Sequence, residues 1–130
     1  MAELTTNVSV VWNGGKTGEG TLQAEYLDTK IAIPKALKGS GNGADPKELL
    51  VSSAAACYVE TLTAILENRK LPVEDHSLQS EATLFNNELK IRHFPKIVLS
   101  VDATEAQVQS AKRTLKAADR ACNVGNLLKK

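Results

Sequence analysis

The sequence predicts an α+β fold that combines an antiparallel sheet with one long, buried helix. Over residues 1–34, apolar and polar residues alternate between glycine clusters, which is typical of a β-meander. Residues 45–70 have the pattern of an uninterrupted helix, residues 76–102 that of a β-hairpin, and residues 104–121 that of a second helix. Because strands and helices do not alternate one by one, we expect the sheet to be antiparallel and residues 1–130 to form one domain.

The long helix follows a glycine-rich segment, residues 35–44, that we expect to be a mobile loop. Asp45 is a suitable N-cap, Pro46 suits the first turn, and Glu48 stands where its carboxylate can return a bond to the cap amide. Apolar residues cover most of the circumference of the turns that follow, so the helix is expected to be buried. A helix this apolar is hard to cover with the sheet of one 130-residue chain. We therefore expect a homodimer in which the long helices of two chains share a core.

Local signals also define the second half of the chain. The hairpin is predicted to turn at Asn86 and Asn87, and Pro95 predicts an edge position or a bulge in its second strand. Thr104 and Gln107 form a capping box at the start of the last helix. Cys122 lies just beyond the end of that helix.

The charge balance gives no reason to expect nucleic acid or an anionic membrane as a partner, because 16 basic residues face 15 acidic ones. We find no apolar run near the roughly 18 residues that span a bilayer, and no signal-peptide layout, and expect a cytoplasmic protein. In that compartment Cys57 and Cys122 are expected to be thiols or a transient redox pair rather than a structural disulfide. The alternative for each is a small apolar core residue.

Two other kinds of site are not expected. His76 and His93, taken with the two cysteines, lack the Cys-x-x-Cys or His-x-x-x-His spacing of a zinc site, so we expect no bound metal. No Gly-x-Ser-x-Gly elbow accompanies either histidine, which argues against a hydrolase. His93 is interpreted as an ordinary strand side chain, and no cofactor is expected.

The surroundings of both cysteines resemble a known family. Residues 45–50 read Asp-Pro-Lys-Glu-Leu-Leu and residues 55–58 read Ala-Ala-Cys-Tyr. This is similar to the Asn-Pro-Glu-Glu-Leu-Leu and Ala-Ala-Cys-Phe signature of the OsmC / organic hydroperoxide resistance family. Residues 122–124 with residues 127–129 resemble its second motif, Cys-Pro-Val-Ser followed by a Leu-Lys pair. The turn at residues 12–16 is also similar, so the resemblance covers almost the whole chain.

The resemblance implies the OsmC-like fold, an intertwined homodimer with active sites at the subunit interface, and peroxidase chemistry. Cys57 would attack an organic hydroperoxide, with hydrogen peroxide as a further candidate substrate, and become a sulfenic acid. Cys122 would then resolve it to a disulfide. An external dithiol, a lipoyl group or a small thiol, would reduce that disulfide.

The charged residues of the family site are not all conserved in this chain. Family peroxidases pair the first cysteine with an arginine and a glutamate. The glutamate position holds Lys47 here, and Glu48 follows it as either the functional carboxylate or only a helix cap. Lys16 stands at the arginine position, with Lys35 or Lys38 as loop alternatives. The favoured alternative for each of these lysines is a solvated loop residue.

Two further departures lie near the C-terminus. Asn123 replaces the family proline, and the chain stops at Lys130, before the final strand that the resemblance leads us to expect. Because Lys47 replaces the family glutamate and the family arginine is not matched, the alternative function is an OsmC-like redox-sensing or small-molecule-binding protein with little peroxidase turnover.

Overall fold

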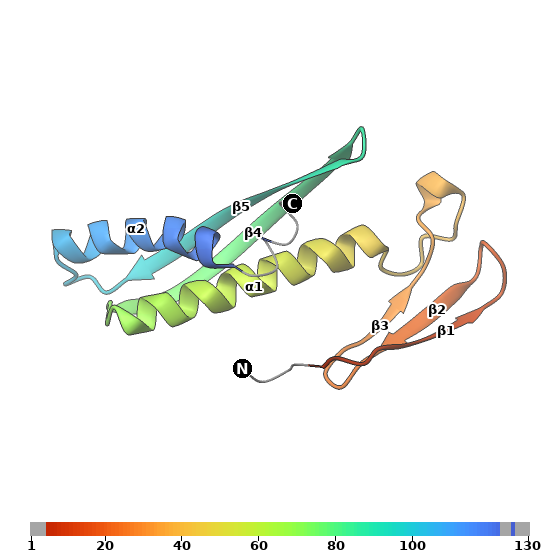
Figure 1. Ribbon diagram of the computed structural model, residues 1–130, viewed down its shortest axis with the longest axis horizontal. Helices are drawn as coiled ribbons and strands as arrows, with labels where there is room; N and C mark the ends of the chain where they lie inside the picture. Colours follow the sequence, from red (N-terminus) through yellow and green to blue (C-terminus); the bar gives the residue numbers. More distant parts are fainter. Residues whose placement is uncertain (1–4, 123–125, 127–130) are drawn as a thin grey trace. The chain divides into compact units, whose positions relative to one another are not determined.

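The computed structural model describes residues 5–122 and residue 126 (Figure 1). The chain divides into two compact units, Met1–Leu49 and Leu50–Lys130, and each is described by itself. The elements in chain order are β1 (Ser9–Asn13), β2 (Glu19–Gln23), β3 (Asp28–Ile31), η1 (Lys35–Leu37), α1 (Pro46–Asn68), β4 (Val73–Phe85), β5 (Glu88–Leu99) and α2 (Glu105–Ala121).

The first unit contains the expected meander, an antiparallel sheet in the order β1-β2-β3. Val10 pairs with Leu22 and Trp12 pairs with Gly20, so these residues share one face of the sheet. A Cβ atom at Gly20 would lie 2.8 Å from the Trp12 side chain, so the glycine leaves room for the indole ring. Apolar side chains therefore gather on this face.

The second strand is shifted from its expected position. The alternation of Leu22, Ala24 and Tyr26 predicts a strand through Tyr26, but β2 ends at Gln23. The amide of Ala24 donates to the Leu27 carbonyl at 2.7 Å, which closes a turn, and Tyr26 in this turn is 94% exposed. Apolar alternation continues through the turn, and this is why the pattern predicted the wrong boundary.

The loop after β3 is tied to the sheet by backbone hydrogen bonds. Ala32 donates to the Ala44 carbonyl at 3.1 Å, and Ala44 donates to the Lys30 carbonyl at 2.9 Å. The short helix η1 lies between these two contacts. The segment expected to be a mobile loop thus contains a defined turn and returns to the edge of the sheet.

Helix α1 begins as the sequence predicts, because the Glu48 amide donates to Asp45 Oδ1 at 2.8 Å. Within one chain a single stripe at four-residue spacing is buried, formed by Ala54, Tyr58, Leu62 and Leu66. One chain therefore covers one face of the helix. The expected burial of its other faces in a homodimer stays a prediction.

By length and composition, α1 is apolar enough to cross a membrane, contrary to the prediction that no such stretch exists. Glu60 and Glu67 are the only charged residues between Leu49 and Asn68. A core helix of a soluble protein meets the same criterion. The face of α1 that carries the buried stripe packs against the rest of its unit, as a core helix does.

The hairpin β4-β5 turns where the sequence predicts, with positive φ angles of 54° at Asn86 and 63° at Asn87. Pro95 pairs in regular register with Leu78, so the bulge considered at that position is absent. The one register shift instead follows Val73. In the described part of the chain β5 pairs only with β4, which gives Pro95 the edge position that was the other expectation.

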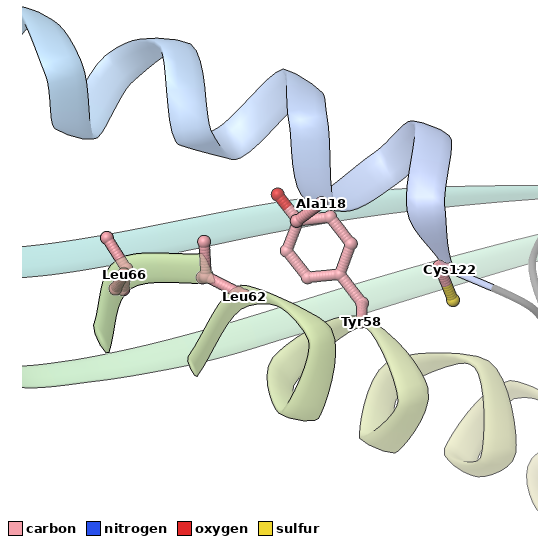
Figure 2. Close-up of a cluster of buried hydrophobic side chains, with 5 residues drawn as sticks. All are labelled: Tyr58, Leu62, Leu66, Ala118 and Cys122. Carbon is pink, nitrogen blue, oxygen red and sulfur yellow. The ribbon is translucent and has the colours of Figure 1, made fainter. Parts of the chain in front are cut away.

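Helix α2 starts with the predicted capping box. The Gln107 amide donates to Thr104 Oγ1 at 3.2 Å, and the Thr104 amide donates to Gln107 Oε1 at 2.9 Å. The helix packs on α1 to form the core of the second unit (Figure 2). Its buried members are Tyr58, Leu62, Leu66, Ala118 and Cys122.

Candidate redox site

Cys57 lies in α1, one residue before the buried stripe member Tyr58, and is half-buried. It packs against the core of its unit and also lines a surface cavity of about 600 Å³. The thiol thus lies between a packed core and a space open to small molecules. The other residues lining this cavity, which we call the Cys57 cavity, are Ser53, Ala56, Glu60, Thr61, Ala64, Ile65 and Ala121.

Cys122 caps the C-terminus of α2 and is only 2% exposed. Its side chain belongs to the buried core, at the end of α2 where that helix meets α1 (Figure 2). The preceding residue, Ala121, lines the Cys57 cavity. The structure therefore brings the end of α2 to the cavity of the first cysteine, and both cysteines are present as thiols.

Tyr58 connects the elements that carry the two cysteines. Its hydroxyl donates to the Leu115 carbonyl in α2 at 3.0 Å, and its ring stacks on His93 with centroids 4.8 Å apart. Burial raises the pKa of Tyr58 above its ordinary value, and the charges of Asp119 and Cys122 raise it further. The phenol therefore keeps its proton and remains a hydrogen-bond donor.

His93 has more contacts than the ordinary strand position predicted for it. Its Nδ1 lies 2.7 Å from Ser80 Oγ on the directly opposed residue of β4. The ring also forms part of a second surface cavity of about 560 Å³, between β5 and α2. Half-buried and exposed residues alternate along β4 and along β5, and Ser80 and His93 both stand at half-buried positions. This alternation is the sequence signal that could have identified them.

Glu48 and Lys16, the predicted charged partners, belong to the first unit, whereas Cys57 belongs to the second. The structure does not bring them together with Cys57 in one unit, and their proposed roles stay predictions. Lys35, Lys38 and Lys47 also lie in the first unit. The Glu48 amide contacts Asp45, as a residue in the first turn of a capped helix does.

Sequence reasoning missed Glu60. Among the described residues that line the Cys57 cavity it carries the only charged side chain, and it stands one helical turn after the thiol. The three-residue spacing from Cys57 could have identified it, since residues three apart share a helix face. The rest of the second motif, Asn123, Val124 and residues 127–129, lies outside the described residues.

The comparison with known proteins identifies the family. A family model described as OsmC-like protein matches residues 39–130, which is most of the chain. The chain belongs to the OsmC family. The chain is also 34% identical to the uncharacterized protein YmaD of Bacillus subtilis, over 98% of this chain and 89% of that protein. The organic hydroperoxide resistance protein OhrB of the same organism is 25% identical over 94% of this chain and 88% of its own length.

Solved OsmC-like structures confirm the α+β fold with antiparallel sheets and two main helices. An OsmC-like protein of unknown function from Vibrio cholerae superposes with a TM-score of 0.77 at 16% identity, covering 97% of this chain and 93% of its own. An organic hydroperoxide resistance protein OsmC from Legionella pneumophila has a TM-score of 0.75 at 22% identity, covering 98% and 91%. At these identities the similarity shows the fold alone.

Proposed function

We propose that this OsmC-like protein is a thiol-dependent peroxidase that reduces organic hydroperoxides, with Cys57 as the attacking thiol and Cys122 as the resolving thiol. The observation that supports this most is the Cys57 cavity, where the half-buried thiol and Ala121, the neighbour of Cys122, line one space. Family membership supports a peroxide-related function, since relatives named organic hydroperoxide resistance proteins match the chain.

The proposed catalytic cycle needs the two cysteines, the peroxide and one external dithiol reductant. The Cys57 thiolate attacks the peroxide, the O–O bond breaks, and the alkoxide takes a proton and leaves as an alcohol. The sulfur is oxidised to a sulfenic acid. The Cys122 thiol then forms an S–S bond with it, and the S–O bond breaks to release water. A dithiol, such as a lipoyl group, reduces the disulfide and is itself oxidised.

We also propose that the protein is a cytoplasmic homodimer. Along α1, Leu50, Ala56 and Ala64 are exposed within one chain. In the hairpin Phe85 and Phe94 are 72% and 52% exposed. We take these exposed apolar side chains as support for an interface with a second copy of the chain. Sedimentation analysis is expected to give a dimer, and Ala64→Glu, which places a charge on the exposed face of α1, is expected to weaken it.

Peroxide consumption tests the proposal directly. Wild-type protein with cumene hydroperoxide and dihydrolipoamide is expected to turn over, Cys57→Ser to lose all enzymatic consumption, and Cys122→Ser to perform one oxidation and then accumulate sulfenic or sulfinic acid. Equal slow consumption by wild type and Cys57→Ser would show that the protein is not a peroxidase.

One observation favours a redox-sensing or small-molecule-binding function as the second candidate. Among the described residues lining the Cys57 cavity there is a carboxylate, Glu60, but no lysine or arginine. A nearby cation favours a thiolate and a nearby carboxylate disfavours it. A sensor would form the Cys57–Cys122 disulfide with peroxide stoichiometrically but show little turnover when dihydrolipoamide is added.

A further inference from the structure

We propose that Tyr58 is a positioning residue of the cysteine pair: its side chain fixes α2 against α1, so that Cys122 is held where it can condense with oxidised Cys57. This inference rests on the proposed function, in which the two sulfurs form a disulfide. It assigns a role to a residue that adjoins Cys57 in the sequence but points away from the Cys57 cavity, which Tyr58 does not line.

The contacts of Tyr58 join three elements of the second unit. From α1, the hydroxyl reaches the Leu115 carbonyl of α2, 57 residues along the chain, at 3.0 Å. The ring stacks on His93 of β5 at an interplanar angle of 27°. His93 is in turn held by Ser80 of β4 at 2.7 Å. The phenol ring is thus fixed by the hairpin, while its hydroxyl fixes α2.

The anchoring point on α2 is well placed to control Cys122. Leu115, Ala118 and Cys122 are three and four residues apart and therefore share one face of the helix end. Cys122 lies two turns, about 10 Å, beyond Leu115. Ala118 between them is fully buried, at 0% exposure. Packing of its methyl group is not directional, whereas a hydrogen bond is. The bond from Tyr58 to Leu115 therefore helps to fix the register of α2, together with the bond from Arg69 to the adjacent Thr114.

The two parts of the Tyr58 side chain have different partners. The hydroxyl makes the bond to Leu115 in α2, whereas the ring stacks on His93 of β5. Burial, and then the charges of Asp119 and Cys122, raise the pKa of Tyr58, so the hydroxyl stays a donor.

The step affected is resolution. Cys57–SOH and the Cys122 thiol form an S–S bond, the S–O bond breaks, and water leaves with the thiol proton. Attack of Cys57 on the peroxide precedes this step and forms no bond to Cys122, although Ala121 of α2 lines the same cavity. Loss of the Tyr58 hydroxyl should therefore slow disulfide formation more than it changes the first oxidation.

The test compares wild type with Tyr58→Phe, which keeps the ring, and with Tyr26→Phe, which makes the same change at a tyrosine that is 94% exposed. Each full-length protein is equilibrated with reduced and oxidised dithiothreitol, and the Cys57–Cys122 disulfide is quantified by non-reducing peptide mapping. The equilibrium constant measures the effective concentration of one thiol at the other. It does not depend on peroxide. Thermal unfolding is measured in parallel.

Tyr58→Phe is expected to lower this constant by roughly two- to tenfold, as the ordinary net strength of one neutral hydrogen bond suggests. Tyr26→Phe should match wild type. The positioning role is overturned if Tyr58→Phe has an unchanged or raised constant, even where it unfolds at lower temperature, since that would be a structural effect only. It is also overturned if wild type forms no such disulfide in excess oxidised dithiothreitol.

The peroxidase proposal can fail while the positioning role of Tyr58 stands. If wild type forms the disulfide with dithiothreitol, Tyr58→Phe lowers the constant, and cumene hydroperoxide is not consumed, the peroxidase proposal fails while the positioning role stands. With peroxide as oxidant, trapping by a 1,3-dione is expected to show a smaller effect of Tyr58→Phe on the rate of sulfenic acid formation than on the lifetime of the sulfenic acid. The sulfenic acid should persist roughly two- to tenfold longer in the variant.

Discussion

Arg69, just beyond the end of α1, donates a hydrogen bond from Nη1 to Thr114 Oγ1 in the middle of α2 at 2.7 Å. Thr114 is completely buried and is the one buried polar residue among those described. Its own hydroxyl donates to the Ser110 carbonyl at 2.8 Å, so both hydrogen-bonding roles of the oxygen are used. Two hydrogen bonds therefore join the α1 segment to α2: one from Arg69, just after α1, to Thr114, and one from Tyr58, within α1, to Leu115.

The Arg69–Thr114 bond is expected to stabilise the second unit. Arg69→Met should reduce the free energy of unfolding by about 1–3 kcal/mol, because a hydrogen bond to a charged donor is lost. Urea unfolding at fixed protein concentration measures this. Arg113→Met is the matched control, since Arg113 lies on the exposed side of α2. If the double variant Arg69→Met with Thr114→Val loses the full sum of the two single effects, the residues are not coupled.

Glu60 is expected to slow reactions of the Cys57 thiolate. It lines the Cys57 cavity, and a nearby carboxylate disfavours a second negative charge. Glu60→Gln should therefore increase the rate of alkylation by iodoacetamide at neutral pH by a factor of roughly two to five, and added salt should shrink the difference through screening. Glu67→Gln changes a glutamate of the same helix that does not line this cavity. Equal acceleration in both variants would argue against a local effect.

The raised pKa of Tyr58 predicts a pH dependence of stability. The ordinary value is 10.0, and burial, followed by the charges of Asp119 and Cys122, raises it in the folded protein. The folded state therefore holds this proton more tightly than the unfolded chain. The contribution is complete below pH 10.0 and is lost as the pH rises through the higher folded value. Stability should thus fall above about pH 10, and less so in Tyr58→Phe.

Ultraviolet titration at alkaline pH checks the same prediction. The chain has two tyrosines, and Tyr26 is 94% exposed. The part of the phenolate absorbance that is missing in Tyr58→Phe should appear above pH 10.0, the ordinary value for this group. Appearance of that part at or below pH 10.0 would contradict the assigned burial of Tyr58.

The features that the sequence predicted correctly are local. Asp45 caps α1, Thr104 and Gln107 cap α2, and the hairpin turns at Asn86 and Asn87, because each signal lies within four residues of the structure it creates. The boundary of β2 was wrong because the apolar alternation does not stop at the turn. Pro95 likewise allowed two predictions, an edge strand or a bulge, and these are distinguished by the strand pairing, which the sequence does not contain.

The candidate site could be predicted only in part, because its contacts join residues that are far apart in the sequence. Cys57 and Cys122 were identified through motifs, which record residue types along the chain. The bond of Tyr58 to Leu115 spans 57 residues, and the contact of Ser80 with His93 spans 13. Such contacts depend on how α2 and the hairpin pack on α1. Periodicity identifies the faces involved but not which residues meet across them.

The hairpin turn offers a test of backbone conformation. Asn87 has a φ of 63°, in the left-handed region that glycine and asparagine tolerate and β-branched residues do not. Asn87→Val is expected to destabilise the protein by about 1–2 kcal/mol, in line with the cost of the left-handed region, while Asn87→Gly should be neutral or slightly stabilising. Thermal unfolding of both variants measures this. Thr83→Val, in the regular part of β4, is the control for placing valine in the hairpin. If Asn87→Val were as stable as Asn87→Gly, the turn could not have the left-handed geometry described for it.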